Sequence, residues 1–165
     1  MVLQSFSSTI QISGMMLLII TGAKTFSQIL AFSGASKGMI DFVLGAQVTP
    51  IMIIIIMQLI ILFMGMFFDT VSIMMITIPI FFPIVEALGL DSLWFGVMFL
   101  LNIEMSMTTP PFGLSLYVMK GVAPEGTTLG DVISSGFPFL VVDAIVMALM
   151  LIFPQIVLWL PNVMK

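Results

Sequence analysis

Two adjacent prolines, Pro110 and Pro111, interrupt a long apolar sequence and limit how the chain can fold there. Neither residue has a backbone N–H, so no regular helix can continue through the pair. Gly113 follows and allows the backbone angles that a reversal needs. In a membrane, irregular backbone survives only where protein buries it or where it lines a watery cavity. For a membrane chain, this break therefore predicts a binding site.

Composition places the chain in a lipid bilayer. Of its 165 residues 61% are hydrophobic and 7% are charged, with a mean hydropathy of +1.30, which a soluble domain cannot have. The chain has no cysteine and no histidine, which excludes disulfides, thiolate metal sites and a Ser-His-Asp hydrolase on this chain alone. The net charge is −4 and arginine is missing, so no basic surface for nucleic acid exists. We expect an all-α integral membrane protein that is not an enzyme and holds no organic cofactor.

Four apolar segments are candidate membrane spans. They are residues 10–33, 51–68, 71–88 and 137–160. Each approaches the roughly 20 residues that a helix needs to cross a bilayer. Pro79 and Pro83 lie one turn apart in the third segment and predict a kink, and Trp159 with Lys165 predicts an interfacial anchor after the fourth. We expect four to five transmembrane helices within one membrane domain, residues 1–165.

Residues 93–120 form two shorter apolar arms around the two prolines. At a rise of 1.5 Å per residue the longer arm, 93–107, reaches about 22 Å, short of the roughly 30 Å hydrocarbon core. Two short arms meeting at residues 108–111 favour a re-entrant helical hairpin whose tip stops near mid-membrane. The alternative is one proline-kinked helix that crosses the bilayer, and it leaves the polar residues of this segment without a common purpose.

Those polar residues are candidate ligands for a substrate or for sodium. The main candidates are Ser106, Thr108, Thr109, Pro110, Pro111 and Gly113, and weaker ones are Asn102 and Glu104. The hairpin tip would offer hydroxyl groups and unpaired backbone carbonyls to the membrane interior.

Asp69 is the second feature that bears on function, because it lies between two apolar segments. Asp69-Thr70 before an apolar run predicts a helix N-cap. If the two segments are one helix broken at depth, Asp69 is intramembrane and Gly65 frees carbonyls for a cation. If they are two helices joined outside the membrane, Asp69 is a capped loop carboxylate. An intramembrane Asp costs about 2.5–3.5 kcal/mol on insertion scales, so sodium or a proton would be an economical partner.

Gly65, Asp69 and Thr70 therefore join the candidate substrate and sodium site. Sodium itself would be held by Gly65, Asp69 and Thr109, because a hard cation takes oxygen ligands.

At these motifs the chain resembles the large membrane subunit of tripartite ATP-independent periplasmic (TRAP) transporters, in its C-terminal half. The matching residues are Gly65-Met66-Phe67-Phe68-Asp69, Pro79-Ile80-Phe81-Phe82-Pro83-Ile84, Leu88-Gly89-Leu90-Asp91 with Trp94-Phe95-Gly96, and Thr109-Pro110-Pro111-Phe112-Gly113 with Leu116. Gly22-Ala23, Phe26-Ser27 and Gly34 also fit. The ordered set is specific, whereas any one tripeptide is weak.

The resemblance implies a secondary transporter of the inverted-repeat, elevator type in the bacterial inner membrane. Such a permease moves organic acids inward with sodium as the coupling ion, receives substrate from a periplasmic binding protein and has a small membrane subunit as partner. This chain holds one copy of each motif, so we expect it to be the second repeat alone and to need the first-half repeat. A competing interpretation is a membrane scaffold or assembly subunit without its own transport site.

Overall fold

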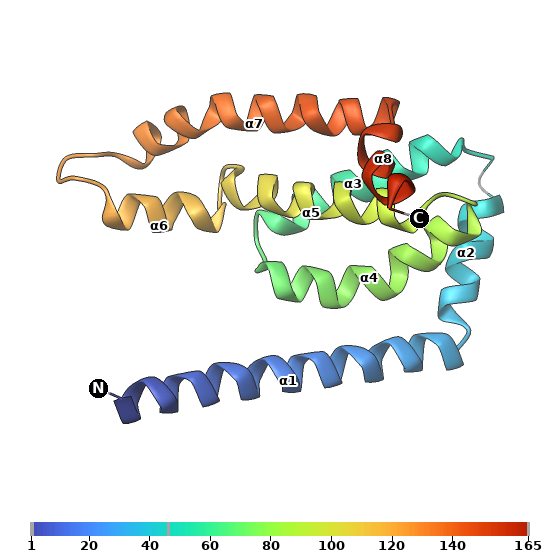
Figure 1. The fold of residues 1–165 in the computed structure, drawn as a ribbon, viewed down its shortest axis with the longest axis horizontal. Helices are drawn as coiled ribbons and strands as arrows, with labels where there is room; N and C mark the ends of the chain where they lie inside the picture. Colours follow the sequence, from blue (N-terminus) through green and yellow to red (C-terminus); the bar gives the residue numbers. More distant parts are fainter. Residues whose placement is uncertain (1, 46, 165) are drawn as a thin grey trace.

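The computed structural model describes residues 2–45 and 47–164, and these residues form helices joined by short turns (Figure 1). The expected all-α fold class is confirmed for this part of the chain, while Lys165 lies outside the described residues. The helices are α1 (Val2–Phe32), α2 (Ala35–Gly45), α3 (Pro50–Gly65), α4 (Thr70–Ala87), α5 (Ser92–Thr108), α6 (Leu114–Val122), α7 (Leu129–Ile152) and α8 (Gln155–Val163).

Three of the described helices contain a segment long and apolar enough to cross a membrane. These segments are Thr9–Phe32, Thr70–Ala87 and Leu129–Ile152, and α3 and α5 are apolar but shorter. The last span differs from the predicted residues 137–160. It begins earlier, because Thr128 and Asp131 form a capping box at its start, and it ends before Pro154, after which α8 begins.

The chain folds back on itself between α3 and α4, at residues 66–69 (Figure 1). α5 and α6 instead follow one another in the same direction, and α7 returns alongside both (Figure 1). The lining of one cavity agrees with this arrangement. Thr108 of α5 and Leu116 of α6 both face α7, where Gly136 and Phe139 complete the lining. The structure thus differs from the hairpin predicted at residues 93–120, which is here a helix broken at residues 109–113.

The lengths of α5 and α6 explain this difference. Each helix alone is shorter than a bilayer, but the 17 residues of α5 and the 9 residues of α6 together reach about 39 Å when placed end to end. The sequence prediction measured each arm separately and assumed that the second arm returned. The part of the chain that folds back on itself is instead α3–α4, and we call residues 66–69 its tip.

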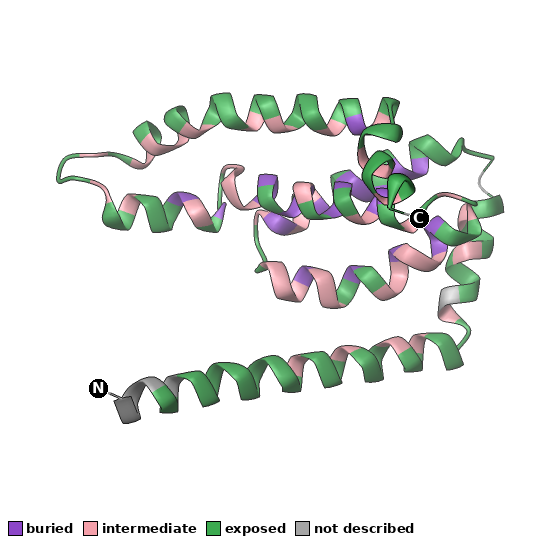
Figure 2. Cartoon of the chain, in the orientation of Figure 1, coloured by how far each residue is buried: buried purple, intermediate pink, exposed green. Residues whose placement is uncertain are grey.

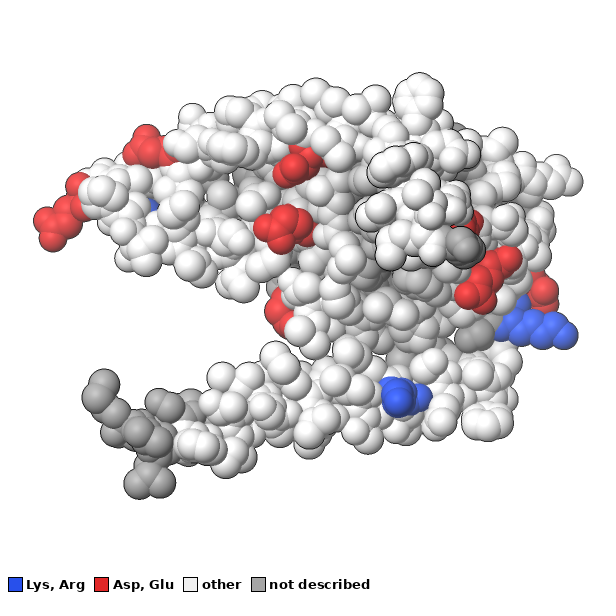
Figure 3. Space-filling view, in the orientation of Figure 1, with Lys and Arg blue, Asp and Glu red and all other residues white. Residues whose placement is uncertain are grey.

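The core lies between α3, α4 and α5, and the outer helices are largely uncovered (Figure 2). Ile54, Ile61 and Phe95 are fully buried there. Trp94 ties α7 to this core, because its Nε1 donates to the Met150 carbonyl at 2.8 Å. By contrast, none of the candidate span in α1 and only 6% of that in α7 is buried. The face shown in Figure 3 is mostly uncharged, with a few charged side chains, several of them gathered at one end, as expected for helices that face lipid or further protein.

Candidate functional site

The tip of α3–α4 packs against the break between α5 and α6. The ring centroids of Phe67, at the tip, and Phe112, in the break, lie 5.3 Å apart. The Thr70 hydroxyl donates to the sulfur of Met107 at 3.2 Å. We call residues 65–70 and 106–113 the tip–break junction. It contains all nine main candidate residues, whose roles in binding stay predictions.

Gly65 lies against Ser106 across the junction. Both are buried, and a Cβ atom placed on Gly65 would overlap the Ser106 side chain. A glycine is therefore needed at the end of α3 for the tip to reach α5. The close approach brings the carbonyl-bearing ends of α3 and α5 together, and these helix ends carry partial negative charge.

The two prolines leave backbone carbonyls of α5 without their usual helical donors. In a continuous helix, residues 110 and 111 would donate N–H groups to the carbonyls of Ser106 and Met107, but prolines have none. The Ser106 carbonyl instead accepts from the Thr109 N–H at 3.2 Å. A Cβ atom on Gly113 would lie 2.5 Å from the Met107 carbonyl oxygen, so this glycine lets the backbone turn closely past it.

The hydroxyl groups of the break direct their protons into α5. Thr108 and Thr109 both donate to the Met105 carbonyl, at 2.9 and 2.7 Å, and Ser106 donates to the Ile103 carbonyl at 2.6 Å. A hydroxyl whose proton is engaged still has lone pairs for accepting a hydrogen bond or coordinating a cation. The break therefore offers oxygen atoms as acceptors, as a site for a hard cation requires.

Asp69 is the N-cap of α4, which confirms the capping prediction. Its Oδ2 accepts from the Ser72 N–H at 3.0 Å and its Oδ1 from the Ser72 hydroxyl at 2.6 Å. Hydrogen bonds to a carboxylate favour its ionised form. The side chain is exposed at the tip, so it remains open on the side away from Ser72. α3 and α4 are two helices joined by a turn at residues 66–69, and not one broken helix.

The N-terminus of α6 enters the junction without a capping side chain. Its N-cap residue is Gly113, which makes no side-chain cap, and of the first N–H groups that of Leu116 donates to the Gly113 carbonyl at 3.0 Å. Free N–H groups at a helix N-terminus favour an anion such as a carboxylate. The start of α6 therefore favours an anion. The end of α5, whose carbonyl groups carry partial negative charge, lies on the other side of the break.

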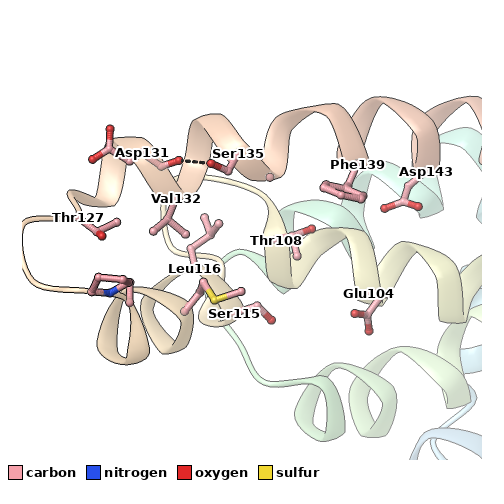
Figure 4. Close-up of a pocket in the computed structure, with 14 residues that line it drawn as sticks. Glu104, Thr108, Ser115, Leu116, Thr127, Asp131, Val132, Ser135, Phe139 and Asp143 are labelled. Atoms are coloured by element: carbon pink, nitrogen blue, oxygen red, sulfur yellow. Dashed lines mark hydrogen bonds between the residues drawn. The ribbon is translucent and has the colours of Figure 1, made fainter.

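The break lies opposite the middle of α7. Thr108 and Phe139 line the same cavity, and Phe139 is near the centre of Leu129–Ile152 (Figure 4). Since α7 is long and apolar enough to span a bilayer, its centre corresponds to mid-membrane when it does so. That geometry would place the tip–break junction at depth.

The cavity itself is unsuited to an organic anion. It has a volume of about 540 Å³ and is lined by the carboxylates Glu104, Asp131 and Asp143, with no lysine or arginine in its lining (Figure 4). Carboxylates would repel a carboxylate substrate. Glu104, a weaker candidate from the sequence, lines this cavity.

Asn102, the other weaker candidate, is buried between α5 and α3. Its Nδ2 donates to both the backbone carbonyl and the side-chain Oε1 of Gln58, at 2.6 Å each. It thus holds α3 against α5 one turn before Ser106.

Among the described residues, no group of three or more His, Cys, Asp or Glu side chains could hold a metal ion. A sodium site here would depend on hydroxyl and carbonyl oxygens beside a single carboxylate.

Sequence reasoning missed several residues of the junction. Met107 and the pair Phe67 and Phe112 looked like ordinary apolar residues, and only the fold brings them together. Gln58 did carry a signal, because it is the one polar side chain within α3. Its partner on α5 could not be identified without the packing.

Comparison with known proteins decides the family. The sequence profile described as "Tripartite ATP-independent periplasmic transporter, DctM component" matches residues 1–156. The chain belongs to the DctM family. The resemblance seen at the motifs is thereby confirmed, and it extends over nearly the whole chain.

Relatives of this DctM-family chain are named as membrane permeases. It is 34% identical over 157 residues to the C4-dicarboxylate TRAP transporter large permease protein DctM of Rhodobacter capsulatus, covering 95% of this chain and 35% of the relative. It is 31% identical to the sialic acid TRAP transporter large permease protein SiaM of Vibrio cholerae, covering 97% and 37%. The chain therefore spans about a third of the length of these relatives.

Proposed function

We propose that this chain is part of a TRAP-type permease that carries organic acids across the bacterial inner membrane with sodium as the coupling ion. The observation that carries the proposal is the packing of the α3–α4 tip on the break between α5 and α6, through Phe67 with Phe112 and Thr70 with Met107. Broken helices around a central site are a common way for secondary transporters to bind an anion and a cation together. The named substrates of two relatives, C4-dicarboxylates and sialic acid, are both acids, which supports a carboxylate substrate.

Within the junction, sodium and substrate would occupy different groups. The Asp69 carboxylate, the hydroxyls of Thr108 and Thr109 and the backbone carbonyl groups near Gly65 and Met107 would bind sodium. The N-terminus of α6, preceded by Gly113, would bind the carboxylate of the substrate. A bound sodium ion would also reduce the repulsion between Asp69 and that carboxylate.

The remaining parts of the system are proposed from the family. The chain would be the second repeat of an inverted-repeat permease, and the rest of the permease would complete the site. A small membrane subunit and a periplasmic binding protein would be its partners. A scaffold without a transport site accounts for the packing of Gly65 on Ser106, but it gives no role to the uncapped start of α6 or to the Met107 carbonyl, whose helical donor Pro111 removes.

The test is the variant Asp69→Asn in the complete permease with its binding protein. Asparagine caps a helix about as well as aspartate, so α4 should keep its start while the junction loses a charge. We expect uptake to depend less steeply on sodium concentration. Asp91→Asn is a matched control, because Asp91 is the N-cap of α5 and accepts from the N–H groups of Leu93 and Trp94 far from the tip. An unchanged sodium response in Asp69→Asn would leave Asp69 as a helix cap only.

A further inference from the structure

Gln58 has a buried hydrogen-bond donor that nothing in the described part of the chain accepts. Only 8% of the residue is exposed, and its two carbonyl oxygens are both engaged by Asn102. The Nε2 atom is the one buried side-chain nitrogen or oxygen among the described residues without a hydrogen-bond partner. Buried polar groups are nearly always paired, so an unpaired one indicates a missing acceptor.

A pocket of about 250 Å³ adjoins this amide, between α3, α5 and α7. Gln58 and Asn102 supply its only polar side chains. The rest of the lining is apolar and includes Leu59, Met98, Ala144, Ala148 and Leu151. Ala144 and Ala148 lie one turn apart on α7, and their small side chains leave the space open.

The chemistry of the lining limits what the pocket can hold. It contains no charged residue, so an ion would lose its hydration without a counter-charge. A buried water molecule needs roughly two to four polar partners. Here the polar side chains, Gln58 and Asn102, lie on the α3–α5 side of the pocket, and the α7 side offers none. A neutral molecule with an apolar body and one acceptor oxygen fits both the apolar lining and the unpaired amide. Its body fills the pocket, and its oxygen accepts from Gln58 Nε2.

We propose that this pocket binds a neutral amphiphile, an apolar chain that carries one hydroxyl or ester carbonyl oxygen. Such a group could be supplied by a membrane lipid or by a free medium-chain alcohol. The occupant would contact α7 on one side and the α3–α5 pair on the other, and would stabilise the packing of α7 against them. This site is separate from the tip–break junction, so it does not depend on the proposed transport function.

Photolabelling tests the proposal. Purified chain in phospholipid nanodiscs is irradiated with a diazirine derivative of octanol, and in a second arm with a phospholipid that carries a diazirine in its acyl chain. We expect adducts on the pocket peptides around Leu59, Met98 and Ala148, competed away by unlabelled octanol. Adducts from the second arm would identify lipid as the source, and adducts from the first arm alone would identify a free alcohol. No competed adduct at these peptides in either arm would overturn the proposal.

Two variants make the test specific. Gln58→Met removes the donor but keeps the backbone carbonyl that Asn102 uses, and we expect pocket labelling to fall about two- to tenfold, the loss expected from one hydrogen bond. Ala148→Leu fills the pocket and should also abolish labelling, whereas Ala31→Leu adds the same side chain to the exposed face of α1 and should leave it unchanged. Labelling of Gln58→Met at the level of the unaltered chain would refute the role of the amide. Loss of labelling in the complete permease would also overturn the proposal, because the rest of that protein would then occupy the pocket.

Discussion

Gly65 illustrates how one residue positions the candidate site. It has no side chain, and this absence lets the end of α3 contact Ser106 on α5. Around it, Thr70 and Met107 add a polar contact and Phe67 and Phe112 an aromatic one. The site therefore depends on close packing across the tip–break junction as much as on its oxygen atoms.

The substitution Gly65→Ala should disrupt this packing. The new Cβ would overlap Ser106, and overpacking of this kind costs about 1–3 kcal/mol. We expect a lower free energy of unfolding in detergent titrations and, in the complete permease, slower uptake. Gly22→Ala is the control, because a Cβ there meets no atom within 4 Å and alanine favours a helix. Equal stability of the two variants would argue against a tight contact between α3 and α5.

At the scale of elements, the sequence predicted where a helix ends better than where the next one goes. Pro110 and Pro111 correctly predicted the end of α5, and Asp69 correctly predicted the start of α4. The direction of α6 is set by packing against α7, where Leu116 lies beside Gly136 in the lining of one cavity. That contact joins residues distant in sequence, so neither prolines nor segment lengths reveal it.

Cysteine labelling tests the path of α5 and α6 across the membrane. The chain has no native cysteine, so single cysteines at Leu93 and Val122, which are 50% and 77% exposed, can be labelled with an impermeant reagent. We expect labelling from opposite sides of the membrane, because α5 and α6 run in succession. α3 and α5 begin near the same end of the molecule (Figure 1), so a cysteine at Ile51, in the first turn of α3, should be labelled from the same side as Leu93. Labelling of Leu93 and Val122 from one side would restore the re-entrant hairpin.

The whole molecule has much uncovered apolar surface. The family and the all-α class were predictable, since both follow from composition and from motifs that are local in sequence. The pairing of Gln58 with Asn102, and the cavity between α5–α6 and α7, were not, because they arise from contacts between distant helices. The candidate spans of α1 and α7 are the least buried, and lipid or further protein must cover them.

Reconstitution tests whether this chain is sufficient for transport. In liposomes with a sodium gradient and a matched binding protein, we expect no concentrative uptake by the chain alone, because alternating access in such permeases needs two halves that move relative to each other. The same chain co-expressed with a first-half repeat should transport. Uptake by the lone chain would mean that copies of it assemble a working site among themselves.

The central claim, that the tip–break junction binds sodium, is tested most directly by the reactivity of a cysteine at its edge. Phe68, which is 54% exposed and adjacent to Asp69, is replaced by cysteine in the complete permease. Its rate of reaction with an impermeant thiol reagent is then measured in sodium and in potassium at equal ionic strength. We predict a slower reaction in sodium, with a saturable concentration dependence, and loss of the difference when Asp69→Asn is added. Equal rates in the two ions at all concentrations would contradict a sodium site at this junction.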